Sequence, residues 1–215
     1  QPNYAESYFN LGNSLREQGK LEESIEAYQQ AITIRPNHPE AYSNLGIVLK
    51  EQGRLKESIE VYQQAIHIQP DYAQAHINLG VVLREQGRLK ESIQAHQQAI
   101  RIQPDYAEAH IHLAITFLLQ GQFAAGWKEF EWRRPRKHDF KRPVWDGTSL
   151  KGKSILVHTE QGFGDSIQFA RYIDLLPDTD STIIVACQAE LKSLFKSIDR
   201  IDTLVTEGVK TPDFD

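Results

Sequence analysis

The chain has 215 residues, of which 25% are charged and 40% are hydrophobic, and its formal net charge is −5. An acidic total argues against a nucleic-acid-binding protein. No apolar run reaches the roughly 18 residues that a membrane-spanning helix needs, so we expect no membrane partner. The single cysteine, Cys187, excludes an intramolecular disulfide framework and favours a reducing compartment. We therefore expect a cytoplasmic protein.

A repeat of 34 residues dominates the chain up to residue 134. Segments 39–72 and 73–106 agree at 24 of 34 aligned positions, a first copy covers residues 5–38, and a weaker fourth copy covers 107–134. Within each copy, apolar residues recur at helical spacing in two stretches that a Gln-Gly pair separates. Each copy is therefore predicted to form two helices joined by a glycine turn.

Small residues and prolines recur at fixed positions of the copies. Position 8 is glycine in the first three copies, and a proline at position 32 ends each predicted second helix: Gly12, Gly46, Gly80, Pro36, Pro70 and Pro104. These residues resemble the tetratricopeptide repeat family. The resemblance implies a mainly α-helical, right-handed superhelix in which the first helix of each pair lines a concave groove. The fourth copy departs from the pattern at Arg133, which indicates the end of the array.

The first four residues match the end of a copy rather than its beginning. Gln1-Pro2-Asn3-Tyr4 corresponds to Gln69-Pro70-Asp71-Tyr72. We therefore expect residues 1–4 to be the tail of a preceding repeat that is not part of this chain.

Two columns of polar residues are expected to face the groove. Position 6 of the copies holds three asparagines and a histidine, and position 12 holds three cations: Asn10, Asn44, Asn78, His112, Arg16, Lys50 and Arg84. An asparagine offers a donor and an acceptor to a peptide backbone. The column resembles the asparagine ladder of the O-linked N-acetylglucosamine transferase repeats, which implies binding of an extended peptide. The alternative is that duplication alone copied these residues.

Three histidines invite a metal-site interpretation, which the sequence disfavours. His76 and His110 hold position 4 of adjacent copies, and His96 holds position 24, where the first two copies have tyrosine. No carboxylate or cysteine joins them at ligand spacing, so we expect packing roles and neither a metal nor another cofactor. The basic run from Arg133 to Arg142 is interpreted as part of a linker over residues 135–153.

After residue 153 the pattern changes to alternating strands and helices. Short β-branched runs predict strands, amphipathic stretches predict helices, and this alternation predicts parallel strands with right-handed crossovers. Residues 154–215 are thus expected to form a partial, Rossmann-like α/β domain. Its predicted strands are 154–159, 182–187 and 203–205, and its predicted helices are 165–176 and 189–198.

Two patterns that are typical of nucleotide-binding sites occur in part in this region. Residues 147–154 satisfy the G-x-x-x-x-G-K-S spacing of a phosphate loop, but that site needs a strand before it and a helix after it. Here a strand is expected to follow, so we interpret the match as accidental. Gly162-Phe163-Gly164 begins a dinucleotide fingerprint, but Ile167 replaces its third glycine.

Residues 155–173 (ILVHTEQGFGDSIQFARYI) resemble the first strand, loop and helix of heptosyltransferase-like glycosyltransferases of the two-lobed GT-B architecture. The resemblance to this family implies that Asp165 is the base acting on an acceptor hydroxyl. Combined with the upstream repeats and the linker residues 142–147, the segment resembles a bacterial class of repeat-bearing proteins with such a domain. It also implies that Gly162 and Gly164 let an acceptor sugar approach the backbone. The structural alternative is a capping box formed by Asp165 and Gln168. Because the donor-binding lobe has no counterpart, we do not expect this chain to be a competent enzyme.

The leading hypothesis is a protein-interaction module that binds an extended peptide or partner protein in its groove, within a larger glycosyltransferase. One alternative is a nucleotide- or small-molecule-binding α/β module whose repeats serve as an oligomerisation arm. Another is a scaffold that self-associates through the solenoid ends.

Overall fold

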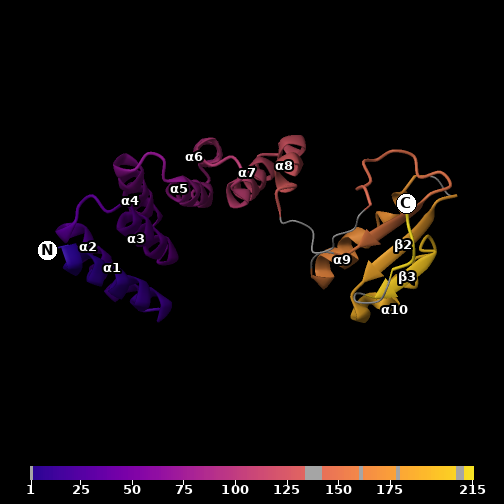
Figure 1. Ribbon diagram of the computed structural model, residues 1–215, viewed down its shortest axis with the longest axis horizontal. Helices are drawn as coiled ribbons and strands as arrows, with labels where there is room; N and C mark the ends of the chain where they lie inside the picture. Colours follow the sequence, from indigo (N-terminus) through magenta and orange to yellow (C-terminus); the bar gives the residue numbers. More distant parts are fainter. Residues whose placement is uncertain (1, 134–141, 160–161, 178–179, 207–210) are drawn as a thin grey trace. The chain divides into compact units, whose positions relative to one another are not determined.

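The computed structural model describes residues 2–133, 142–159, 162–177, 180–206 and 211–215 (Figure 1). The chain divides into two compact units, residues 1–137 and 138–215, each of which is described by itself. Within the described ranges, none of the helices combines the length and the apolar character that crossing a bilayer requires. Most of the basic run, residues 134–141, lies outside the described residues.

The first unit consists, over its described residues, of four successive helix pairs. Each second helix packs on the first helix of its own pair (Figure 1). The second helices α2, α4 and α6 also pack on the first helix of the next copy. The pairs are α1 (Pro2–Glu17) with α2 (Leu21–Ile34), α3 (Pro39–Glu51) with α4 (Leu55–Ile68), α5 (Ala73–Glu85) with α6 (Leu89–Ile102), and α7 (Ala107–Leu119) with α8 (Phe123–Phe130). The predicted helix–turn–helix copies are therefore present.

The predicted Gln-Gly turn has the same geometry in every pair. At the end of α3, Gly53 has a φ of +75° and donates its N–H to the carbonyl oxygen of Lys50. The N–H of Arg54 donates to the carbonyl oxygen of Leu49. This is a Schellman cap, which requires a left-handed residue and so favours glycine. The other three turns repeat it, with a φ of 73° to 75° at Gly19, Gly87 and Gly121.

A glycine under an aromatic ring brings the two helices together in each of the first three pairs. In the second copy the ring of Tyr62 lies against Gly46, where an added Cβ would be 2.6 Å from the ring. Beside it, the buried hydroxyl of Ser58 donates to the carbonyl oxygen of Gly46 at 2.7 Å. The first copy repeats both contacts with Gly12, Tyr28 and Ser24. Close packing and a satisfied buried hydroxyl thus fix the pair.

The two ends of the array differ from the inner copies. Residues Pro2–Tyr4 continue α1, whereas their equivalents Pro70–Tyr72 lie outside a helix, between α4 and α5. Proline is well suited to the first turn of a helix, where its missing N–H needs no partner. At the other end, α8 has 8 residues where α6 has 14.

The second unit is built on a small parallel sheet. Its strands are β1 (Ser154–His158), β2 (Thr182–Cys187) and β3 (Thr203–Thr206), in the order β1-β2-β3. The central strand β2 is buried from Ile183 onward and supplies the core of this unit. The parallel arrangement agrees with the prediction. Three strands do not by themselves make a Rossmann fold, and that finer assignment is not established.

Both predicted helices of this unit are wrong in extent. Instead of 165–176, helix α9 covers Phe163–Ala170 and a separate 3-10 turn, η1, covers Ile173–Leu175. The tighter turn lets Ile173 reach the core beside Ile183 and Val185.

Instead of 189–198, the chain forms a 3-10 turn, η2 (Ala189–Leu191), and one short helical segment, α10 (Lys192–Phe195). Leu191 and Phe195 enter the same core, so packing rather than helical propensity decides the local path here.

The predicted capping box is also wrong. The residue that caps α9 is Gly162, whose backbone is extended, and no side chain caps the helix. Asp165 therefore lies inside the first turn instead of preceding it. β1 begins at Ser154, the last residue of the sequence that matches a phosphate loop, so a strand and not a helix continues that sequence.

Candidate functional site

Polar side chains of the first helices recur along the array, between apolar ones. We call this surface the first-helix face and define it by the polar residues at positions 6, 9 and 12 of the copies: Asn10, Asn13, Arg16, Asn44, Lys50, Asn78, Arg84 and His112. Hydrogen bonds and ion pairs link α1 to α3, α3 to α5 and α5 to α7 across this surface. The predicted column residues are therefore brought onto one connected face.

Asn13 is the centre of the polar contacts at the first two copies. Its side-chain oxygen accepts hydrogen bonds from the Tyr28 hydroxyl at 2.7 Å and from the Asn44 amide at 2.8 Å. Asn10 is exposed and makes no hydrogen bond to a described residue. Asn13 lies outside the predicted column, since the later copies hold Ile47 and other apolar residues at its position.

The third asparagine of the column is held differently. Asn78 accepts a hydrogen bond from the Gln74 side chain at 3.1 Å, one helical turn earlier on α5. Gln74 in turn accepts a hydrogen bond from the hydroxyl of Tyr106, the last residue of the same copy, which directly precedes α7. The predicted ladder therefore consists of asparagines with unequal partners, and a bound peptide would meet different available groups at each copy.

The cations of position 12 are half-buried between the first helices. Lys50 lies 3.8 Å from Glu85, and Arg84 donates to His112 Nδ1 at 3.4 Å. No carboxylate of a described residue lies within 4.0 Å of Arg84, and burial lowers the pKa of its guanidinium. Burial, together with the charge of Arg84, also lowers the pKa of His112, so that ring is neutral at pH 7.

Beneath this face lies an imidazole without hydrogen bonds. His96 is fully buried against Gly80, at the position where earlier copies have tyrosine, and neither ring nitrogen has a hydrogen-bond partner among the described residues. Its ring stacks on His112 with centroids 5.6 Å apart. Burial, aided by the nearby His112, lowers the pKa of His96 to about 3. Within the described ranges, no three His, Cys, Asp or Glu side chains are arranged to hold a metal ion.

The second candidate site is the start of α9 in the second unit. Gly162, Gly164 and Asp165 are all exposed there. Behind them, Gln188 at the end of β2 accepts hydrogen bonds from Thr159 at 3.0 Å and from Ser166 at 3.4 Å. These contacts, which no pattern in the sequence predicts, attach α9 to the carboxyl ends of β1 and β2.

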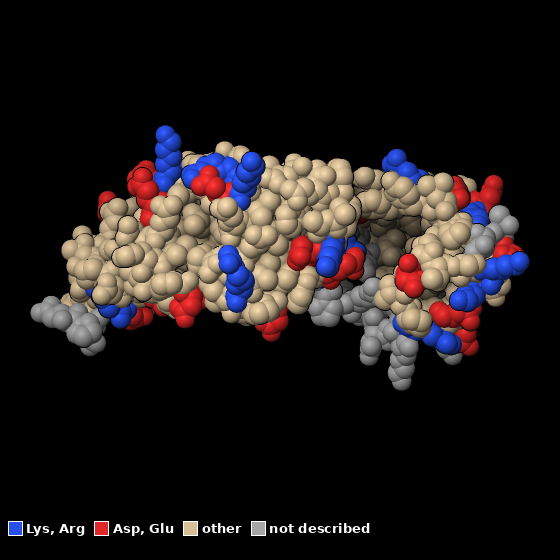
Figure 2. Space-filling model, turned by 90° about the horizontal axis from the view of Figure 1, so that it is seen from above, with Lys and Arg blue, Asp and Glu red and all other residues tan. Residues whose placement is uncertain are grey.

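Charges of both signs share the molecular surface. On the face drawn in Figure 2, Lys and Arg side chains lie among Asp and Glu side chains, and much of the surface carries no charge. A continuous basic patch, the usual sign of nucleic-acid binding, is not present on the described residues of that face.

The helical copies match known repeats. Residues 12–53 match the family model described as TPR repeat, and residues 37–105 match the model described as tetratricopeptide repeat. Protein FlbA of Caulobacter vibrioides is 34% identical over 88 residues, which is 35% of this chain. The chain spans only 14% of the length of FlbA.

Solved structures show the same helical arrangement. The crystal structure of MamA matches with a TM-score of 0.57 and 25% identity, over 61% of this chain and 77% of MamA. The first TPR domain of Spaghetti (RPAP3), bound to the HSP90 peptide SRMEEVD, matches with a TM-score of 0.55 and 18% identity, over 56% of this chain and 96% of that one. PilF of Pseudomonas aeruginosa matches with a TM-score of 0.56 and 24% identity, over 60% of this chain and 59% of PilF.

Proposed function

We propose, on the premise that the helical copies are tetratricopeptide repeats, that this chain is a protein-interaction module. Its first-helix face holds an extended, acidic segment of a partner protein. The observation that carries the proposal is Arg84, a half-buried cation with no carboxylate of a described residue within 4.0 Å and a neutral imidazole beside it. Half-burial removes part of the water around this guanidinium, and a ligand carboxylate that pairs with it would offset that cost.

The asparagines complement this charge. Amide groups on α1, α3 and α5 offer donors and acceptors to the backbone of an extended chain, whatever its side chains are. The RPAP3 domain, whose fold is similar, is bound to a peptide that contains two glutamates and one aspartate. This supports an acidic peptide as the class of ligand.

The test is fluorescence anisotropy with an extended peptide rich in Glu and Asp, compared with the same peptide in which Gln and Asn replace them. We expect Arg84→Gln to weaken the acidic peptide about tenfold, the usual loss of a hydrogen bond to a charged group. The matched control is Arg54→Gln, because Arg54 already pairs with Glu57 at a turn. Equal binding of the two peptides would contradict the acidic assignment.

The amide contribution has its own test. If Asn44 and Asn78 hold the peptide backbone, their replacement by Ala should weaken both peptides alike. Binding that survives both replacements would remove the ladder from the mechanism. Concentration-dependent light scattering without peptide would favour the alternative of a self-associating scaffold.

For the second unit, we propose a relationship to the acceptor half of GT-B glycosyltransferases. The support is a parallel sheet whose first strand leads into α9 with exposed Gly162, Gly164 and Asp165 at its start. Acceptor sugars should shift the backbone NMR signals of these three residues, while nucleotides and nucleotide sugars should not. Shifts caused by nucleotides would favour the alternative of a nucleotide-binding module.

A further inference from the structure

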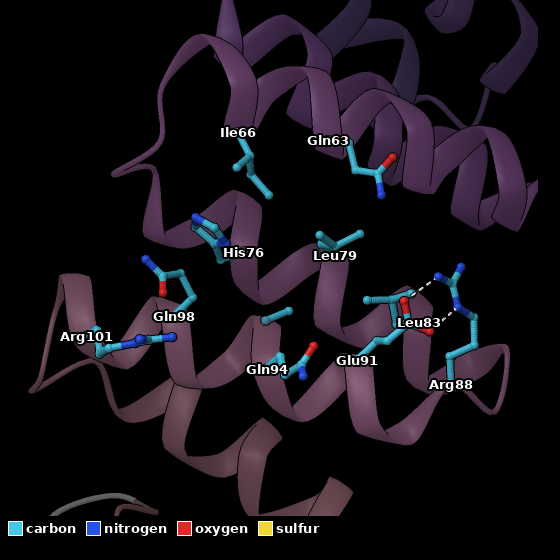
Figure 3. Close-up of a pocket in the computed structure, with 11 residues that line it drawn as sticks. Gln63, Ile66, His76, Leu79, Leu83, Arg88, Glu91, Gln94, Gln98 and Arg101 are labelled. Carbon is cyan, nitrogen blue, oxygen red and sulfur yellow. Dashed lines mark hydrogen bonds and ion pairs between the residues drawn. The ribbon is translucent and has the colours of Figure 1, made fainter.

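A hollow lies away from the first-helix face, between the second helices of neighbouring copies. It has a volume of about 550 Å³ and opens between α4 and α6, with α5 as its floor (Figure 3). Ile66, Leu79, Leu83 and Ala95 supply apolar surface, while Gln98 and Arg101 contribute polar groups. This hollow uses none of the residues that define the first-helix face.

One polar side chain in this hollow is nearly buried, and only one of its two ring nitrogens makes a hydrogen bond to a described residue. His76, on α5, is 8% exposed and its Nε2 lies 3.0 Å from the carbonyl oxygen of Pro70. A carbonyl only accepts, so Nε2 carries a hydrogen. The other ring nitrogen, Nδ1, makes no hydrogen bond to a described residue. The hollow therefore contains an imidazole that can bond to an incoming group.

The next copy shows what such a histidine binds. His110 occupies the same repeat position, and its Nε2 makes the same contact, 2.9 Å from the carbonyl oxygen of Pro104. Its Nδ1 lies 2.6 Å from a carboxylate oxygen of Glu129. The ring of Trp132 stacks on the imidazole with centroids 3.9 Å apart and an interplanar angle of 7°. A carboxylate and a flat ring together satisfy this histidine.

In the copy that contains the hollow, neither a carboxylate nor an aromatic ring stands at the two corresponding positions. Ala95 stands at the repeat position of Glu129, and Gln98 stands at that of Trp132. His76 is therefore retained while the two groups that satisfy its counterpart are missing. In the second copy Tyr42 replaces the histidine. The hollow arises where the histidine is present without its carboxylate and its ring.

We propose that this hollow is a second docking site, which binds a helix of a partner protein carrying an acidic residue and an aromatic residue one turn apart. The acidic side chain accepts a hydrogen bond from His76 Nδ1–H and the aromatic ring stacks on the imidazole, as Glu129 and Trp132 do at His110. Because the carbonyl oxygen at Nε2 and the carboxylate at Nδ1 both only accept, the ring carries a hydrogen on both nitrogens in the complex and is a cation there. A groove between two helices suits a helical ligand that presents anchors at i and i+3. The exposed Arg101 at the rim adds attraction for an acidic helix.

The probe is a short, lactam-bridged helical peptide with Glu and Trp three residues apart on an Ala and Lys background, labelled with fluorescein. Anisotropy against the whole chain should show saturable binding. The same peptide with Gln in place of Glu should bind about tenfold more weakly, since it loses a charge-assisted bond. Absence of saturable binding would overturn the proposal.

The decisive variant fills the hollow from within the chain. Ala95→Glu combined with Gln98→Trp reproduces the arrangement around His110, so the variant should fold, melt at a higher temperature and lose the peptide. Gln64→Trp, at the same repeat position of the second copy, is the matched control and should bind normally. If the double variant folds and still binds the peptide, the site lies elsewhere.

Further measurements keep the proposal testable if the double variant does not fold. His76→Tyr introduces the residue of the second copy and removes Nδ1, so the Glu and Gln peptides should then bind equally. Arg84→Gln on the first-helix face should leave this peptide unaffected, which separates this proposal from the previous one. Indole-3-propionate that binds as tightly as the peptide would overturn the assignment to a protein segment.

Discussion

The aromatic ring of Tyr62 lies so close to the backbone of Gly46 that no side chain can be accommodated between them. A Cβ on Gly46 would lie 2.6 Å from the ring, well inside van der Waals contact. Because Tyr62 is almost fully buried between helices, its ring has little space into which to move. This contact sets the spacing of α3 and α4.

We therefore expect Gly46→Ala to lower the free energy of unfolding by about 1–3 kcal/mol, the usual cost of overpacking a core. Urea unfolding followed by circular dichroism measures it. In a Tyr62→Leu background, where the ring is absent, the same substitution should cost much less. An equal cost in both backgrounds would show that the Tyr62 contact is not the cause.

The buried imidazole of His96 should make stability depend on pH. Its pKa is about 3 in the folded chain and about 6.5 when unfolded, so the unfolded state takes up the proton first as pH falls. The contribution of the neutral His96 ring to the free energy of unfolding is fully present above pH 6.5 and is lost progressively as the pH falls below that value. At pH 5 the loss attributable to His96 should be about 2 kcal/mol.

Other groups also titrate in acid, so the measurement is a comparison of unfolding curves of the wild type and His96→Tyr between pH 7.5 and 5. Tyrosine stands at this position in the first two copies and does not titrate in this range. The variant should lose less stability than the wild type. Parallel pH dependence of the two proteins would refute the role of His96.

Asn13 should matter to stability more than its neighbour on the same helix. Asn13→Ala leaves the Tyr28 hydroxyl and the Asn44 amide without their shared acceptor, which should cost about 1–3 kcal/mol. Asn10→Ala is the control, because Asn10 is exposed and bonds to no described residue. Thermal unfolding should separate the two variants, and equal melting temperatures would contradict the structure.

The contacts of His110 should stabilise α8, the short second helix of the fourth pair. Glu129→Gln weakens the bond to His110 Nδ1, and Trp132→Ala removes the stacked ring. Either change should speed amide hydrogen exchange in α8 while α3 and α4 exchange as before. Trp127→Ala, an exposed position on α8, provides the comparison. Faster exchange throughout the array would point instead to global destabilisation.

Much of the helical array could be predicted from the sequence because its signals are local and repeated. The Gln-Gly pairs become Schellman turns, and the glycine of position 8 accommodates the ring of position 24. Periodicity could not reveal contacts that depend on one copy alone. Asn13 bonds to Asn44 only because its neighbours on α2 and α3 bring the right groups, and its own column is otherwise apolar.

The second unit was predicted less well for a related reason. β-branched residues identified the strands, since a buried parallel strand has few alternatives. The helices were mistaken because Ile173 and Phe195 turn inward to fill the core, and this shortens the helical segments. The pattern Asp165–Gln168 resembled a cap, yet the extended backbone of Gly162 begins α9 instead.

The turns at Gly53 and Gly87 have the same backbone geometry and the same flanking residues. Removing residues 55–88, one period of 34, would join Arg54 to Leu89, the same Arg-Leu pair that follows each of the two inner Gln-Gly turns. Gly46 would then receive the ring of His96 in place of that of Tyr62. The Gly-Arg-Leu junction already exists in the present chain, and a glycine under an imidazole, which would join α3 to α6, already occurs at Gly80 and His96. The number of copies can therefore change by deletion or duplication of a whole 34-residue copy without creating a new kind of helix contact. The length of the array can vary in this way while the turns and the contacts between helices keep the same geometry.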